Sequence, residues 1–409
     1  MKENILIRGV NWVGDAVMSM PAIRAIRKAY PGARISLLVK PWVAPLFDKS
    51  PDIDDVVLYG EQFEGLAGRL RLAWALRRKR FDRAILLQNA FDAALIAYLA
   101  RIPERVGFGR DFRSFLLTKP VEFGGEDRRM HHIDYYLELL KRAGIEAPHS
   151  DPWIHLSLEE RLQAREKLKG LRRPVVGINP GAQFGPAKQW MPERFASLTT
   201  KIVEDLGGSA VVFGGHGEAA LADSILGASS VDSARAVSMA GKTTLRELVG
   251  LVSECDALVT TDSGPMHIGY ATGTPLVAIF GSTSPALTGP VGYGHKVLRH
   301  EAECSPCFDR ECTEEEKMRC MEAVTVDEVF ESLREALPTG RAVLFDRDGT
   351  LCEYAEYLNK WQNLNVLDDI KYTKRLIHKD FSLIGITNQS GIARGIVEED
   401  FVRKVNTLF

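Results

Sequence analysis

Short apolar runs alternate with helical segments along most of this 409-residue chain, and this alternation restricts the fold more than any other feature. The runs fall into two series, at residues 4–10, 34–39, 55–58 and 84–87, and at residues 174–179, 209–213, 256–261 and 274–280. Strands that alternate with helices form parallel sheets covered by helices on both faces. The sequence therefore predicts an α/β protein, with ligands beyond the carboxyl ends of the strands.

Two linkers divide the chain, at residues 149–152 and at Pro338-Thr339-Gly340. We expect an N-terminal α/β domain over residues 1–155, a second α/β domain over 156–337 and a partial domain over 341–409. A chain of 409 residues is long enough for two or three domains, each with its own core.

Composition excludes several classes of protein. An apolar content of 45% and a charged content of 26% are typical of a soluble globular protein. The sequence contains no run of 18 apolar residues, so we expect no membrane-spanning helix. Arg8 and Asp15 interrupt the first apolar stretch, which therefore does not read as a signal peptide. Six cysteines are too few for a secreted disulfide scaffold, so we expect a reducing cytoplasm.

Charge is unevenly distributed. Residues 1–148 hold 24 Lys and Arg against 18 Asp and Glu, whereas the remainder holds 28 against 36. The basic excess peaks in one predicted helix, with Arg69, Arg71 and residues 77–80. A solvated helix face is the ordinary interpretation, and a surface that faces anionic lipid or an anionic acceptor is the functional one. No nucleic-acid-binding motif accompanies the charge, so we expect no nucleic-acid partner.

Asp15 follows the first predicted strand, within the sequence WVGD. A carboxylate in this loop can reach a ligand in the crevice and remove a proton from a hydroxyl group. Capping of the next helix is the alternative role. The same loop lacks the G-x-G-x-x-G pattern of a dinucleotide turn, which argues against a pair of nicotinamide-binding domains. His131 and His132 precede another predicted helix. Adjacent histidines on a helix point in different directions, so we assign them no shared ligand.

Two loops of the second series have features of a phosphate site. Residues 177–195 read as strand, loop and helix, and Lys188 precedes the helix, where free N–H groups and its charge favour a phosphate. Asp262, Ser263 and Gly264 similarly open a helix at the end of a strand. A solvated lysine and simple helix capping are the alternatives.

Three segments resemble the lipopolysaccharide ADP-heptose heptosyltransferases of glycosyltransferase family 9, most closely those of type II. The segments are WVGDAVMSMPA around Asp15, residues 180–190, and DSGPMHIGYATGTPLVAIFGSTSP from Asp262. The resemblance covers about residues 4–337. It implies the GT-B fold, in which a Rossmann-like acceptor domain precedes a Rossmann-like nucleotide-sugar domain.

The same resemblance implies an activity and its partners. Heptose would be transferred with inversion, and without a metal, from ADP-L-glycero-D-manno-heptose to a Kdo or heptose sugar of the lipid A inner core. The enzyme would work in the cytoplasm of a Gram-negative bacterium, in transient contact with the inner membrane surface. By resemblance Asp15 is the catalytic base and Lys188 faces the diphosphate. The donor-binding residues that it implies are Gly181, Glu218, Asp262, Ser263, Gly264 and His267.

Four cysteines follow in the pattern C-x2-C-x4-C-x7-C, at Cys304, Cys307, Cys312 and Cys320. Thiolates at short spacing can hold structural zinc, but only the first pair has the usual spacing. Reduced or loosely paired thiols are the favoured alternative.

The tail begins with an apolar strand followed by Asp346-Arg347-Asp348-Gly349-Thr350. Two such carboxylates can serve as nucleophile and proton carrier beside magnesium. The motif resembles the haloacid-dehalogenase phosphatases, in particular heptose 1,7-bisphosphate phosphatase. Residues 384–395 match the second motif of that enzyme, which implies that Thr387 and Asn388 bind phosphate.

The later lysine and metal-ligand motifs of those phosphatases are absent, and only about half of such a domain is present. We therefore expect the tail to be an inactive, truncated HAD-like segment. Two other functions remain open: a phosphatase or bifunctional protein that acts on heptose 1,7-bisphosphate, and a non-catalytic protein that binds membrane glycolipid.

Overall fold

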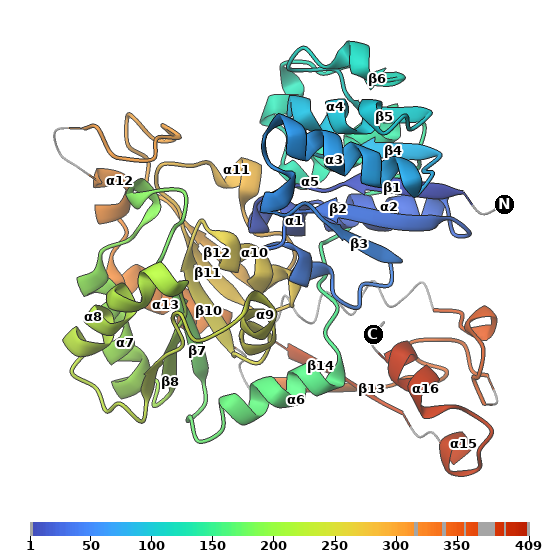
Figure 1. The fold of residues 1–409 in the computed structure, drawn as a ribbon. Helices are drawn as coiled ribbons and strands as arrows, with labels where there is room; N and C mark the ends of the chain where they lie inside the picture. Colours follow the sequence, from blue (N-terminus) through green and yellow to red (C-terminus); the bar gives the residue numbers. More distant parts are fainter. Residues whose placement is uncertain are drawn as a thin grey trace. The chain divides into compact units, whose positions relative to one another are not determined.

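The computed structural model describes residues 3–314, 318–337, 341–355, 357–366, 381–387 and 390–406. It divides into two compact units, Met1–Ala336 and Leu337–Phe409. The larger unit contains two parallel sheets of six strands each, which confirms the predicted α/β class (Figure 1).

The first sheet has the strand order β3-β2-β1-β4-β5-β6, and all its pairs are parallel. Its strands are β1 (Asn4–Arg8), β2 (Arg34–Val39), β3 (Asp55–Leu58), β4 (Arg83–Leu86), β5 (Glu104–Phe108) and β6 (Lys119–Val121). Alternate residues of β1 enter different cores, because side chains along a strand point to opposite faces. Ile5 and Ile7 pack in one core and Leu6 in the other.

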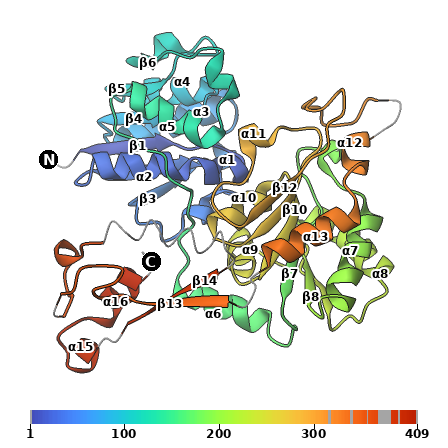
Figure 2. The same ribbon diagram turned by 180° about the vertical axis from the view of Figure 1, so that it is seen from behind.

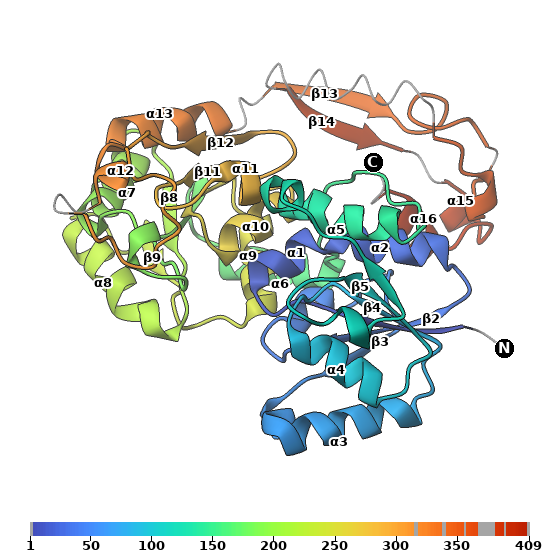
Figure 3. The ribbon, with the colours of Figure 1, turned by 90° about the horizontal axis from the view of Figure 1, so that it is seen from above.

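Helices cover both faces of this sheet. The first core is completed by α1 (Val13–Met18), α2 (Met20–Ala29) and α5 (His132–Arg142). The second is completed by α3 (Gly65–Arg78) and α4 (Phe91–Leu99), which lie on the opposite side of the sheet (Figure 3).

The second sheet repeats this architecture with the order β12-β11-β10-β7-β8-β9. Its strands are β7 (Val175–Asn179), β8 (Ser209–Val212), β9 (Ala236–Ser238), β10 (Ala257–Thr261), β11 (Leu276–Ile279) and β12 (His295–Leu298). The helices are α6 (Leu158–Lys167), α7 (Pro192–Glu204), α8 (Ala219–Ala228), α9 (Leu245–Ser253), α10 (Gly264–Ala271), α11 (Pro285–Thr288), α12 (Arg319–Glu322) and α13 (Val326–Ala336).

Several elements differ from the prediction. Strands β5, β6, β9 and β12 were not predicted, and β6 and β9 are edge strands of three residues each. The loop predicted around Asp15 is also wrong, because α1 begins at Val13 and carries Asp15 in its first turn. The N-cap of this helix is Trp12, so Asp15 is not the cap either.

The helices α1 and α10 lie against each other, and this contact joins the two sheets of the larger unit (Figure 2). Two glycines permit the close approach. A Cβ atom at Gly14 would lie 2.6 Å from the His267 ring, and one at Gly264 would lie 3.0 Å from Val13. The contact brings the amino-terminal ends of α1 and α10 together.

The smaller unit contains the parallel pair β13 (Arg341–Asp346) and β14 (Phe381–Ile386), with α15 (Ser390–Ala393) and α16 (Glu399–Asn406). Among the described residues of the whole chain, no helix has the length and apolar character needed to cross a bilayer.

We predict that Gly14→Ala will weaken both stability and activity. The new methyl group overlaps the His267 ring, so overpacking should cost about 1–3 kcal/mol. A displacement of Asp15 by roughly 1 Å should reduce the turnover about 10²-fold. Urea unfolding measures the first effect, and initial rates of the sugar transfer that the resemblance implies measure the second. The matched control is Gly227→Ala in α8, whose Cβ would meet no atom within 4 Å. Equal behaviour of the two variants would contradict the packing argument.

Candidate active site

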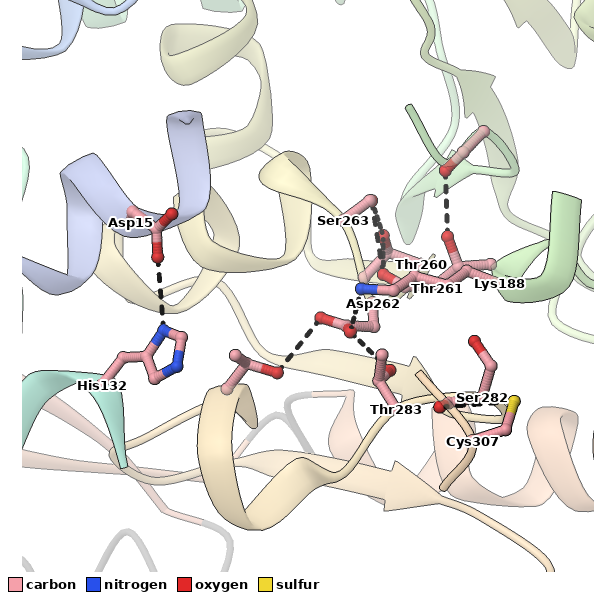
Figure 4. Close-up of polar contacts among 12 residues, drawn as sticks. Asp15, His132, Lys188, Thr260, Thr261, Asp262, Ser263, Ser282, Thr283 and Cys307 are labelled. Carbon is pink, nitrogen blue, oxygen red and sulfur yellow. Dashed lines mark hydrogen bonds and ion pairs between the residues drawn. The ribbon is translucent and has the colours of Figure 1, made fainter. Parts of the chain in front are cut away.

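The catalytic candidate Asp15 forms a pair with a histidine from a distant part of the first domain. Its Oδ1 lies 3.3 Å from Nδ1 of His132, in the first turn of α5 (Figure 4). The adjacent His131 turns elsewhere: its Nε2 lies 3.0 Å from the carbonyl oxygen of Gly289. The two histidine rings therefore have different partners, and His132 belongs to the candidate site.

Asp15 and His132 border a cavity of about 350 Å³ at the carboxyl end of the first sheet. Arg110, Arg128 and Phe123 also line it. The centre of the Phe123 ring lies 4.4 Å from the guanidinium carbon of Arg110 and 5.8 Å from that of Arg128. The cavity is therefore lined by two carboxylates (Asp15 and Asp127), an imidazole and two cations.

Buried Arg113 fixes the wall of this cavity. Its guanidinium donates to the carbonyl oxygens of Phe108 and Gln88 and to the side chain of Asn89, which joins the ends of β4 and β5. Burial lowers its pKa to about 10, which still leaves it charged at neutral pH. The Asn89 amide in turn donates to the Tyr135 hydroxyl at 2.7 Å.

The second domain contributes a buried ion pair. Lys188 Nζ lies 2.6 Å from Oδ2 of Asp262, and the hydroxyl of Thr283 donates to the same oxygen at 2.6 Å (Figure 4). Lys188 stands in the short 3-10 turn Pro186–Lys188, and Asp262 follows β10. The two candidates are thus in contact, which makes the lysine a paired cation rather than a solvated one.

Gly181 and Glu218 also meet. A Cβ atom at Gly181 would lie 1.7 Å from Oε1 of Glu218, so only glycine lets the carboxylate approach this backbone. The other carboxylate oxygen accepts a hydrogen bond from the Gly215 amide at 2.7 Å. The Ser263 hydroxyl accepts a hydrogen bond from the Asn179 side-chain amide at 3.1 Å. Ser263 is the N-cap residue of α10, but its side chain makes no capping hydrogen bond to the helix.

His267 lies between the two groups of candidates. It is only 4% exposed, and its Nδ1 lies 2.8 Å from the Tyr270 hydroxyl. Burial lowers its pKa from 6.5 to about 4, and the carboxylates of Asp262 and Asp15 partly oppose this shift. His267 is therefore neutral at physiological pH, and it lies within electrostatic reach of Asp15, Asp262 and Lys188.

The four cysteines line one small cavity together with Ala187, and each is a free thiol. Within the described part of the chain, no three His, Cys, Asp or Glu side chains are placed to hold a metal ion. The segment that carries the cysteines braces the Lys188 loop, because the Ala187 amide donates to the carbonyl oxygen of Arg310 at 3.0 Å. Phe184 adds to this contact, with the Lys188 and Arg310 cations over its ring.

The tail brings together part of its predicted motif. The Thr387 hydroxyl donates to Asp348 at 2.9 Å, but the Arg347 guanidinium also binds Asp348, at 2.8 Å. Asp346 ends β13. Asn388, the fourth predicted residue, lies outside the described residues.

Comparison with known proteins decides the family. The family model described as glycosyltransferase family 9 (heptosyltransferase) matches residues 69–318. The chain belongs to this family. Lipopolysaccharide heptosyltransferase 2 of Salmonella typhimurium is 34% identical, over 72% of this chain and 87% of the relative.

Solved structures agree with this assignment. The E. coli ADP-heptose LPS heptosyltransferase II is 30% identical, with a TM-score of 0.71 over 82% of this chain and 98% of that one. A family 9 glycosyltransferase from Veillonella parvula shares the fold, with a TM-score of 0.74 at 23% identity over the same shares. The GT-B fold and the heptosyltransferase class are thereby confirmed.

For this family 9 enzyme we predict a loss of stability at acid pH through His267. The unfolded chain binds a proton below pH 6.5, whereas the folded chain does not until about pH 4. Stability is therefore full above pH 6.5 and falls as the pH drops toward 4, by up to about 3 kcal/mol. His267→Gln should flatten this dependence in urea titrations, whereas His216→Gln, at an exposed position, should not. A parent-like slope for His267→Gln would disprove the assignment.

Proposed function

We propose that this family 9 enzyme transfers heptose from ADP-heptose to the inner core of lipopolysaccharide, as a type II heptosyltransferase. One observation carries the proposal: α1, which carries Asp15, packs against α10, whose amino-terminal end follows the Lys188–Asp262 ion pair. Asp15 as a base and Lys188 as a phosphate-binding cation are thus available on the two sides of the α1–α10 contact. The related lipopolysaccharide heptosyltransferase 2 and ADP-heptose LPS heptosyltransferase II supply the substrate class.

In this proposal the donor occupies the second domain. The diphosphate takes the place of Asp262, or joins it, beside the Lys188 ammonium and the amino-terminal end of α10. The Glu218 carboxylate lies against Gly181 and accepts a hydrogen bond from the Gly215 amide, and we assign Glu218 to binding the nucleoside. His267 is assigned to positioning, because its ring is buried against Gly14 and bonded to Tyr270.

The acceptor sugar enters the cavity beside Asp15, where Arg110 and Arg128 can bind its anionic groups. Asp15 accepts the proton of the acceptor hydroxyl, and the oxygen then attacks the anomeric carbon from the face opposite to ADP. The C–O bond to the diphosphate breaks with inversion, and ADP leaves with the electron pair. Lys188 stabilises that negative charge, so the scheme requires no metal.

The enzyme would act on the cytoplasmic side of the inner membrane, where the lipid-linked acceptor is presented. The tail is proposed to be inactive as a phosphatase. Its Asp348 is already held by Arg347 and Thr387, and the described residues bring no set of three metal-ligating side chains together. Magnesium thus does not fit the described part of the tail, and no step is assigned to it.

We predict that Asp15→Asn will remove most of the transfer activity while the enzyme still binds ADP. Removal of a general base typically slows turnover about 10²–10⁴-fold. The assay measures ADP release from ADP-heptose with an inner-core acceptor, and calorimetry measures ADP affinity. Asp223→Asn, at an exposed position on α8, is the matched control. Parent-like turnover of Asp15→Asn would exclude the base assignment, and no acceptor-dependent ADP release by the parent would exclude the function.

We also predict that Lys188→Met will weaken ADP binding. A hydrogen bond from a charged group is worth roughly 1.5–3 kcal/mol, which corresponds to about 10- to 150-fold in the dissociation constant. Methionine keeps the length of the buried stem, and Lys242→Met, at an exposed position, is the control. An unchanged dissociation constant for ADP would remove Lys188 from the donor site.

A further inference from the structure

The outward face of α3 carries large apolar side chains in a row. Leu66, Leu70 and Trp74 are 69%, 48% and 57% exposed. Their spacing of four residues places them along one side of the helix. The opposite side is already occupied, because Leu72 and Leu76 are buried against the sheet. The outward row therefore makes no contribution to the core of this unit.

The helix and the residues that follow it are strongly basic. Residues 65–80 contain six Lys and Arg and no Asp or Glu. The guanidinium carbon of Arg78 lies 3.6 Å from the centre of the Trp74 ring, so cation and aromatic ring form one joint surface. Two of these cations are paired, Arg69 with Asp92 and Lys79 with Asp55. In the part of the chain that the structure describes, Arg77 and Arg78 form no such ion pair.

We propose that this α3 face, made by Leu66, Leu70, Trp74, Arg77 and Arg78, docks on an anionic lipid surface. Leucines and tryptophan suit the boundary between headgroups and acyl chains, where an interfacial helix buries its apolar side. Arginines suit the lipid phosphates, which they bind through planar, forked hydrogen bonds. The complete lack of carboxylates on the helix supplies the charge complementarity that selects lipid as the occupant.

The position of α3 fits this role. The helix forms the outer layer of the first domain together with α4 (Figure 3). It begins after the carboxyl end of β3, at the edge of the sheet that also carries Asp15 and its cavity. Docking through α3 would therefore hold the cavity close to a lipid-linked acceptor. The docking itself needs no transfer activity, so it can fail while the proposed function stands.

The test is co-sedimentation of the full chain with vesicles of phosphatidylglycerol and phosphatidylethanolamine, and with vesicles of phosphatidylcholine alone. The parent should bind the anionic vesicles and release them at high salt. Arg77→Gln/Arg78→Gln should weaken binding by roughly fivefold per charge. Leu70→Ser/Trp74→Ser should weaken it at least about tenfold. The control is Leu162→Ser on α6, whose leucine is 52% exposed.

A soluble acceptor separates docking from catalysis. The α3 variants should transfer heptose to a lipid-free oligosaccharide acceptor at the parent rate and slow down only with acceptor in vesicles. Absence of parent binding to anionic vesicles would overturn the proposal. Unchanged vesicle binding of Leu70→Ser/Trp74→Ser would also overturn the proposal. Binding would then depend on the charges alone, and any polyanion could replace the lipid surface.

Discussion

The contact between α1 and α10 is the constraint on which the candidate site depends. Each helix begins at the carboxyl edge of its own sheet. In the proposed scheme the acceptor binds at the first edge and the donor at the second. Gly14 and Gly264 let the helices approach so closely that the His267 ring fills the space where a Cβ of residue 14 would stand. The Asp15 carboxylate of one domain and the Lys188–Asp262 ion pair of the other thereby lie on two sides of one tight helix contact.

The ion pair of Lys188 and Asp262 gives this region a second property. Both side chains are nearly buried, so an unpaired charge there would be costly, and each partner stabilises the other. A diphosphate can replace the carboxylate as the counter-charge of the lysine at little net desolvation cost. The segment with the four cysteines supports this arrangement, since the Arg310 carbonyl oxygen accepts from the Ala187 amide beside the lysine.

The sequence predicts the layout of the fold because the central strands are continuous apolar runs. It does not predict β6 and β9, which are edge strands of three residues with little apolar signal. It also misses α1, a six-residue helix whose position depends on packing against α10 rather than on its own propensity.

The sequence names the candidate residues one by one, and the structure shows which of them are in contact. His132 lies 117 residues from Asp15, and Lys188 lies 74 residues from Asp262, so only the folded chain shows that each pair is in contact. A signal for His132 was nevertheless present, because it opens a helix at the carboxyl edge of the sheet that carries Asp15. The domain bounds and the roles of the individual site residues remain predictions.

The most direct test is a crystal structure of the enzyme with an unreactive ADP-heptose analogue and an inner-core acceptor oligosaccharide. We expect an Asp15 carboxylate oxygen within about 2.6–3.2 Å of the acceptor hydroxyl that faces the anomeric carbon. We also expect the Lys188 ammonium to contact the diphosphate. An acceptor hydroxyl bound by a different base, or a diphosphate out of reach of Lys188, would contradict the proposed mechanism.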